Sequence, residues 1–367
     1  MFSPLLVKHT LICTILYGSL YIIMKKSLSF LLPVLLLAVA CGKKDRHPVV
    51  TTFAGTGLMG SIDGTGTVAS FSNLMGVTVD TGGNVYVADS HNNLIRKITR
   101  DGVVTTLAGS GAVGSADGKG AAASFFNPAG VAADKSGNIF VADTHNNLIR
   151  KISPDGVVTT IAGRRAGSAD TSSVKFDGPA GIAVDTTGNL YATDWANDMI
   201  RKISPAGIVT NIAGSGKPGS MDGTGSAASF YLPWGIAVDA HNNVYVADSY
   251  NNMIRKINPN GIVTTLAGKK AKGSADGKDT SASFLHPAGI ALDKEGNLYV
   301  ADVGNNKIRK VSPGGVVTTF AGSGERGSAN GSSASASFYR PYGVVVDKDG
   351  TVYIADYENN LVRKISF

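Results

Sequence analysis

Cysteine is almost missing from this chain of 367 residues. Its two cysteines, Cys13 and Cys41, both precede the long repetitive part of the sequence, which begins near residue 49. A disulfide needs two cysteines, and a thiolate metal site usually needs more. Both kinds of site are therefore excluded from the repetitive part.

A dense charge of one sign is missing too. The chain holds 34 Lys and Arg against 27 Asp and Glu, a formal net charge of +7. Lys8, Lys25 and Lys26 precede Cys41 in a stretch without acidic residues, which leaves 31 basic and 27 acidic side chains after it. A dedicated nucleic-acid binder carries a concentrated basic surface. We therefore expect no nucleic acid among the partners.

The sequence motifs of common catalytic sites are absent as well. The chain contains no Gly-x-Ser-x-Gly nucleophile elbow and no phosphate-binding loop of the Walker type. We therefore assign no catalytic residue and expect no metal and no cofactor.

The chain carries instead a unit that is repeated six times at steps of 51 to 54 residues. A period of this size indicates a repeat architecture. In the second copy, four apolar segments of strand length are separated by turn residues, namely 130–133, 138–143, 148–153 and 157–163. The copies begin near Gly76, Gly130, Gly181, Gly235, Gly289 and Gly343.

The two ends of the repetitive part complement each other. The sixth copy reaches Phe367 with three strands, and a segment like the missing fourth strand stands at 49–55. A ring closed in this way has no open edge between its first and last sheets. The sequence therefore predicts an all-β, six-bladed β-propeller over 49–367, with the last blade closed by an N-terminal strand.

A motif in all six copies resembles the NHL repeat. It reads Tyr-Val-Ala-Asp-x-x-Asn-Asn-x-Ile-Arg-Lys-Ile with small variations, and the resemblance covers roughly 49–367. NHL repeats build six-bladed propellers, which the resemblance implies here also. It implies no single activity, because the family includes RNA-binding, protein-binding, sensor and lyase members.

The region before the repeats looks like a bacterial lipoprotein signal. Residues 24–40 join a short basic start to an apolar run, and small residues precede Cys41. The resemblance implies that Cys41 is lipidated and becomes the mature N-terminus, although Ala38 stands where such signals more often carry Leu. We expect a membrane-anchored protein of the cell envelope, either periplasmic or surface-exposed.

The remaining leader segments follow from this interpretation. Residues 41–48 form a tether, and residues 1–23 are an extension if Met24 rather than Met1 is the true start. The alternative is a genuine membrane anchor over residues 10–40.

Residues that recur in all six copies are expected to be structural, because a binding site needs asymmetry. An aspartate ends the second strand and an arginine follows seven residues later, which we interpret as an ion pair that caps a hairpin. The Arg-Lys pair of the third strand is expected on a solvated outer face. A recurring phenylalanine is expected to bury each inter-blade loop. These residues are Asp89, Asp143, Asp194, Asp248, Asp302 and Asp356; Arg96, Arg150, Arg201, Arg255, Arg309 and Arg363; and Phe71, Phe125, Phe176, Phe230, Phe284 and Phe338.

Function is sought where the copies differ on the face that carries the inter-blade loops. There, blades four to six gather aromatic side chains, a histidine and an arginine, and the third blade adds Trp195; such residues suit a polar ligand at a concave mouth. The alternative is that these residues only cover loops. The candidate ligand-binding residues are Trp195, Trp234, Tyr250, His286, Arg340, Tyr342 and Tyr357.

The sequence thus favours a monomeric, non-catalytic binding module for a glycan, a peptide or an envelope protein. The alternative is a metal-dependent propeller enzyme of the lactonase or lyase kind, which the NHL resemblance admits. Such an enzyme needs His or carboxylate ligands that converge on the axis. His91 and His145 occupy equivalent positions on adjacent blades, and we expect them to lie too far out to share a metal.

Overall fold

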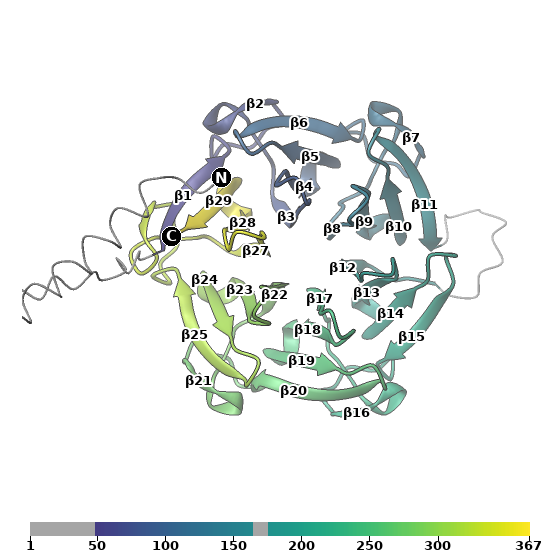
Figure 1. Ribbon diagram of the computed structural model, residues 1–367, viewed down its shortest axis with the longest axis vertical. Helices are drawn as coiled ribbons and strands as arrows, with labels where there is room; N and C mark the ends of the chain where they lie inside the picture. Colours follow the sequence, from purple (N-terminus) through teal and green to yellow (C-terminus); the bar gives the residue numbers. More distant parts are fainter. Residues whose placement is uncertain (1–47, 164–174) are drawn as a thin grey trace, which may run out of the picture. The chain divides into compact units, whose positions relative to one another are not determined.

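The computed structural model describes residues 48–163 and 175–367, and both stretches belong to one compact unit. The predicted signal, tether and lipidation site therefore lie outside the described residues. Figure 1 shows the described sheets as a ring of six blades, with the first strand of each blade nearest the centre. The predicted all-β, six-bladed propeller is confirmed, and the described residues contain no α-helix.

The strands follow the chain from the centre of the ring outward. Blade 1 holds β3 (Leu74–Val79), β4 (Val85–Asp89), β5 (Leu94–Ile98) and β6 (Val103–Ala108), with β2 (Gly64–Thr65) at its edge. Blade 2 holds β8 (Val131–Ala133), β9 (Ile139–Asp143), β10 (Leu148–Ile152) and β11 (Val157–Gly163), with β7 (Gly118–Lys119). Blade 3 holds β12 (Pro179–Val184), β13 (Leu190–Asp194), β14 (Met199–Ile203) and β15 (Val209–Ala213).

The second half of the ring repeats this order. Blade 4 holds β17 (Ile236–Val238), β18 (Val244–Asp248), β19 (Met253–Ile257) and β20 (Ile262–Gly268), with β16 (Gly223–Thr224). Blade 5 holds β22 (Pro287–Leu292), β23 (Leu298–Asp302), β24 (Lys307–Val311) and β25 (Val316–Ala321), with β21 (Gly277–Lys278). Blade 6 holds β27 (Pro341–Val346), β28 (Val352–Asp356), β29 (Leu361–Ser366) and β1 (Val49–Ala54), with β26 (Gly331–Ser332).

Short 3₁₀ turns join the second and third strands of every blade, and four more lie in the inter-blade loops. The first group comprises η2 (Ser90–Asn92), η4 (Thr144–Asn146), η5 (Trp195–Asn197), η7 (Ser249–Asn251), η9 (Val303–Asn305) and η10 (Tyr357–Asn359). The second group comprises η1 (Gly66–Val68), η3 (Gly120–Ala122), η6 (Gly225–Ala227) and η8 (Asp279–Ser281).

The strand β1 closes the ring. It pairs antiparallel with β29, with Val50 opposite Ile365, and with β26 on its other side. Figure 1 shows β1 and β29 side by side, although they come from opposite ends of the described chain. The predicted closure is thus confirmed.

Each of these blades except blade 3 has one strand more than predicted. The extra strand is a two-residue segment of the inter-blade loop that pairs with the fourth strand, as β2 does with β6. In blade 3 the corresponding loop includes the undescribed residues 164–174. A run such as Gly-Thr carries no strand periodicity, so the sequence alone gave no signal for it.

The hydrophobic core is divided among the contacts between neighbouring blades. One cluster joins Ala88 and Ile95 of blade 1 to Val141 and Ile152 of blade 2, and the other clusters repeat this pattern around the ring. The middle strands face a neighbour on both sides, so all five residues of β9 are buried.

The glycine that opens each repeat is required by the close approach of the inner strands. A Cβ on Gly235 would lie 2.1 Å from the carbonyl oxygen of Ala288, and the equivalent glycines have the same kind of neighbour at 2.3–2.4 Å. The central channel is correspondingly narrow, with a free volume of about 60 Å³.

Candidate functional site

The repeated aspartate and arginine form the frame of each blade, as predicted. The Asp356 carboxylate accepts hydrogen bonds from the backbone N–H of Tyr339, from Asn359 Nδ2 and from Arg363 Nη1, at 2.8 Å each. The same pair occurs in all six blades. The recurring phenylalanine is buried in every copy, which confirms its role in the loops.

The expectation of a solvated outer face for the Arg-Lys pair is wrong for the arginines. The Arg363 side chain is fully buried, and its Nη2 donates to Asn330 Oδ1 of the inter-blade loop at 2.9 Å. Four other arginines have the same exposure and find an aspartate at that loop position. Arg201 is the exception, with 12% of its side chain exposed. The lysines remain partly exposed, and Lys364 lies over the ring of Phe53 at 5.8 Å.

The same frame fixes the backbone at the variable positions. Arg340 has a left-handed backbone with φ of 52°, and its N–H donates to Asn306 Oδ1 of the preceding blade at 2.9 Å. His286 has φ of 51° and donates in the same way to Asn252 Oδ1. A left-handed φ is costly for residues other than glycine. The hydrogen bond from each of these N–H groups to an asparagine of the preceding blade holds the backbone in this conformation and so sets the direction of the side chain.

Six of the seven predicted residues line one concave site above blades 3 to 6. We name it the upper hollow; its volume is about 280 Å³. Tyr357 does not line it but packs behind Tyr342, with 4.9 Å between ring centroids. The lining residues are Trp195, Trp234, Ser249, Tyr250, His286, Ala288, Val303, Gly304, Arg340 and Tyr342.

Aromatic rings form the floor of the upper hollow. Trp234 lies between Trp195, at 6.1 Å, and Tyr342, at 5.6 Å, measured between ring centroids. Trp234 and Tyr342 also line the narrow channel. These two residues therefore border both the upper hollow and the channel.

The side chains of Arg340 and His286 also line the upper hollow. Arg340 Nη1 lies 3.4 Å from Glu358 Oε1, and its Nη2 lies 3.4 Å from the Tyr342 hydroxyl. The His286 ring lies 4.8 Å from that of Tyr250, and its Nδ1 is buried without a hydrogen-bond partner. Burial, followed by the charges of Lys272 and Arg340, lowers the pKa of the His286 imidazole, so that it is neutral at pH 7.

Small residues make the upper hollow possible, and sequence reasoning missed them. Ala288 stands where blades 4 and 6 have Trp234 and Tyr342, and Gly304 stands where blade 4 has Tyr250. A Cβ on Gly304 would lie 2.3 Å from Leu285 Cγ. A small residue between large equivalents in neighbouring copies was the available signal.

A threonine that sequence reasoning also missed holds Trp234 from below. The Thr193 hydroxyl donates to the Trp234 carbonyl at 2.6 Å and accepts from the Gly181 N–H at 2.8 Å. The other blades have Ala at this position, so this support is specific to the aromatic side of the ring.

The histidines of blades 1 and 2 lie outside the upper hollow. His91 contacts Tyr357 at 6.3 Å and His145 contacts Phe126 at 4.8 Å, measured between ring centroids. Among residues 48–163 and 175–367, no group of three or more His, Cys, Asp or Glu is placed to hold a metal ion. In the same part of the chain, no helix has the length and apolar character needed to cross a membrane.

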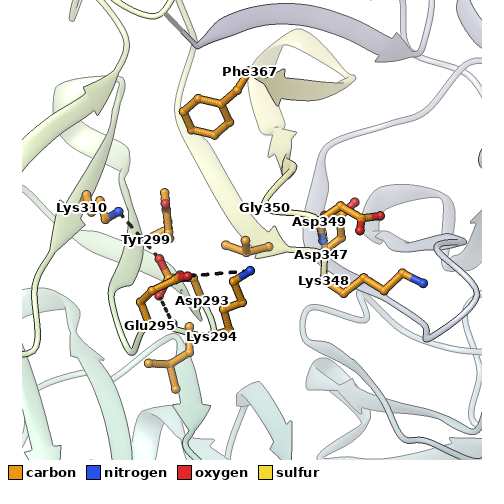
Figure 2. A pocket seen from close by; sticks show the side chains of 12 residues that line it. Asp293, Lys294, Glu295, Tyr299, Lys310, Asp347, Lys348, Asp349, Gly350 and Phe367 are labelled. Atoms are coloured by element: carbon orange, nitrogen blue, oxygen red, sulfur yellow. Dashed lines mark hydrogen bonds and ion pairs between the residues drawn. The ribbon is translucent and has the colours of Figure 1, made fainter. Parts of the chain in front are cut away.

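A larger cavity of about 540 Å³ lies between blades 5 and 6, and we name it the lower hollow. Figure 2 shows Asp293 and Glu295 on one side of it and Asp349 on another. Its charges are satisfied locally: the Asp293 carboxylate accepts from the backbone of its own turn and lies 3.7 Å from Lys310 Nζ. Asp293 is thus already paired within the protein, and the cluster of aromatic rings makes the upper hollow the better candidate site.

Sequence comparison detects related repeats over most of the ring. Residues 71–98, 125–152 and 338–365 match the NHL repeat, and residues 219–276 and 269–339 match the teneurin NHL domain. NHL repeat-containing protein 2 of Gallus gallus is 31% identical over 330 residues, which cover 78% of this chain and 45% of that protein. The chain thus spans less than half the length of this relative.

Two solved structures illustrate the range of proteins with this fold. An auxiliary nutrient binding protein from Bacteroides thetaiotaomicron superposes with a TM-score of 0.67 at 19% identity, covering 87% of this chain and 76% of that one. A streptogramin B lyase superposes with a TM-score of 0.55 at 17% identity, covering 87% and 98%. At these identities the likeness concerns the fold alone.

Proposed function

Because the chain is a six-bladed β-propeller of NHL repeats, we propose that it is a binding module whose ligand is a glycan unit held in the upper hollow. The observation that carries this proposal is the convergence of Trp195, Trp234, Tyr250 and Tyr342 on one concave site. Aromatic rings provide flat apolar contact area with little loss of conformational entropy. They suit the C–H face of a sugar ring.

The size of the upper hollow supports a small ligand. Its volume of about 280 Å³ lies just below the usual range for small-molecule pockets, about 300–1,000 Å³. One sugar ring, or the end of a longer glycan, fits this space better than a folded envelope protein. A peptide side chain is the competing ligand.

An array of glycans and peptides tests this proposal. We expect the full chain to bind members of the glycan set, and the double variant Trp234→Ala, Tyr342→Ala to bind at least about tenfold more weakly, because truncating two central anchors costs more than 1.4 kcal/mol. Phe367→Ala is the matched control: it removes an exposed aromatic ring from the lower hollow and leaves the upper one intact. Equal binding by the double variant and the original chain would refute the site.

We further propose that the protein is located in the bacterial cell envelope. The signal-like residues 24–40 and Cys41 support export and lipidation. Mass spectrometry of the membrane fraction should find a mature chain that begins with acylated Cys41, and Cys41→Ala should release the protein from the membrane. An unmodified Cys41 in the membrane fraction would reject the lipid anchor.

A propeller enzyme is the second candidate. The observation that favours it is His286, which lines the upper hollow and whose pKa is lowered by burial and by the charges of Lys272 and Arg340, since a general base must be unprotonated. Titration calorimetry with Zn²⁺ or Ca²⁺ and a lactone-hydrolysis assay test the metal-dependent form. Stoichiometric metal binding together with turnover would replace the binding-module proposal.

A further inference from the structure

We propose that the ligand of the upper hollow is acidic, namely a uronic acid residue whose carboxylate binds Arg340 while its ring packs against Trp234 and Tyr342. This inference rests on the proposed function and adds the chemical class of the ligand. Three features support it: the weak contacts of the Arg340 side chain, the charges around the upper hollow and the position of the aromatic rings.

Arg340 is held far less tightly than the structural arginine of the same blade. Arg363 has no exposed side-chain area and has donor–acceptor distances of 2.8 Å to Asp356 and 2.9 Å to Asn330. The Arg340 side chain is 48% exposed, and both its contacts, to Glu358 and to the Tyr342 hydroxyl, measure 3.4 Å. Charge-assisted hydrogen bonds are about 2.7–2.9 Å long.

The guanidinium of Arg340 therefore keeps donors for a ligand. Arginine carries five N–H groups in a planar fork that matches both oxygens of a carboxylate. The Arg340 backbone is fixed by the hydrogen bond to Asn306, and its guanidinium lies 5.9 Å from the centre of the Tyr342 ring. The backbone of Arg340 is thus positioned before a ligand arrives, which lowers part of the entropic cost of binding.

The surroundings favour an anion. None of the ten lining residues is Asp or Glu, and Glu358 stands outside the lining. Burial is the largest cause of the lowered pKa of His286, and the charges of Lys272 and Arg340 lower it further.

The aromatic floor selects a ring rather than a free inorganic anion. Trp234 and Tyr342 have ring centroids 5.6 Å apart, and Arg340 contacts Tyr342. A carboxylate on Arg340 therefore places the group that carries it over these rings. In a hexuronic acid the carboxylate is attached directly to the sugar ring, so the sugar ring itself would pack against Trp234 and Tyr342.

Isothermal titration of the full chain in detergent tests this inference with four probes: D-glucuronate, D-galacturonate and the neutral sugars D-glucose and D-galactose. We expect at least one uronate to bind about tenfold more tightly than its neutral counterpart, and 0.5 M NaCl to reduce this preference. The methyl ester of that uronate should bind like the neutral sugar. This comparison needs no variant, so it does not depend on the folding of one.

Variants then assign the preference to a residue. Arg340→Gln should abolish the preference for the acid and change the affinity for the neutral sugar less than about twofold, and Arg340→Lys should retain part of the preference. Arg326→Gln is the matched control, because it removes a positive charge that lies over Tyr339 in the inter-blade loop and outside the upper hollow.

The possible results separate the two proposals. Equal affinity for acid and neutral sugar, with Trp234→Ala weakening both, would overturn the acidic ligand and leave the glycan site standing. A preference for the acid that persists in Arg340→Gln would overturn the role of Arg340. Binding of none of the four sugars would overturn this inference and count against the glycan ligand as well.

Discussion

At the scale of single residues, identical side chains perform the same task in every blade, and different ones stand directly beside them. Asp356 holds the loop that leads to Arg340, and Asn306 holds the N–H of Arg340 itself. The repeated residues thus determine where the variable side chains point. This is how a frame of nearly identical repeats can present one asymmetric site.

Removing the carboxylate of a buried pair should be costly. We expect Asp356→Ala to lower the free energy of unfolding at pH 7 by about 3–5 kcal/mol, because it leaves the buried donors of Tyr339, Asn359 and Arg363 without their acceptor. Denaturant unfolding measures this change. The control is Asp194→Ala, which should cost less stability because its partner Arg201 is partly exposed. Equal losses at the two sites would contradict burial as the cause.

Asn306 acts on Arg340 in two ways, through its side-chain acceptor and through its own left-handed backbone, and two variants separate them. Asn306 has φ of 53° and accepts the Arg340 N–H. Asn306→Gly keeps the left-handed backbone and loses the acceptor, so we expect a loss of about 1–3 kcal/mol in the free energy of unfolding. Asn306→Ala should cost roughly 1 kcal/mol more, because Ala resists positive φ. Thermal or urea unfolding of both variants is the measurement, and an unchanged stability of Asn306→Gly would show that the hydrogen bond does not matter.

Much of the site could be predicted at the residue scale by comparing the six copies with one another. Trp234, Tyr342 and Arg340 differ from their equivalents in size or charge, and the structure brings them together. Gly304 and Ala288 stand between larger equivalents in neighbouring copies, but only the structure shows that the space they leave lies among the aromatic rings. Arg363 was misplaced because its second partner, Asn330, comes from a loop 33 residues earlier in the chain, a contact that the spacing within the repeat does not reveal.

At the scale of elements, the first strand of the described chain completes the last sheet. Without β1, β26 loses its pairing partner, β29 loses one of its two, and the core cluster around Val50 and Ile365 is exposed. The strand could be predicted because its sequence repeats the fourth strand of the other blades. The two-residue strands such as β2 could not, because their pairing depends only on where the loop runs.

A truncation tests the contribution of β1. A chain of residues 56–367 should lose cooperative unfolding, since opening the ring removes an amount of stability comparable to the total of about 5–15 kcal/mol. A chain of residues 48–367 is the matched control and should unfold in one transition. Addition of the peptide 48–55 should restore part of the transition. Identical unfolding curves for the two chains would show that closure by β1 is dispensable.

At the scale of the whole molecule, two sets of aspartates determine how stability depends on pH. Burial raises the pKa of Asp89, Asp248 and Asp356 to about 6. In Asp80 and Asp185 burial also acts to raise the pKa, but hydrogen bonds from the asparagine four residues on and from the backbone lower it below its ordinary value. The two sets therefore respond to acid in opposite directions.

The sign follows from the shifts. As the pH falls through 6, the folded chain takes up protons at the buried aspartates before the unfolded chain does, so this set adds stability. The turn aspartates lose their contribution only as the pH falls below about 4. We expect the free energy of unfolding to hold or rise from pH 7 to pH 5 and to fall below pH 4. Denaturant unfolding across this range is the measurement, and a clear loss between pH 7 and pH 5 would contradict these pKa directions.

The same molecule contains a built-in reporter of its candidate site. The chain has only two tryptophans, Trp195 and Trp234, and both line the upper hollow with their rings 6.1 Å apart. The most direct test of the central claim is therefore a titration of intrinsic tryptophan fluorescence with a ligand whose affinity is known from calorimetry. We predict a saturable fluorescence change with the calorimetric Kd. Calorimetric binding without any change in tryptophan emission would place the ligand elsewhere and contradict the upper hollow as the binding site.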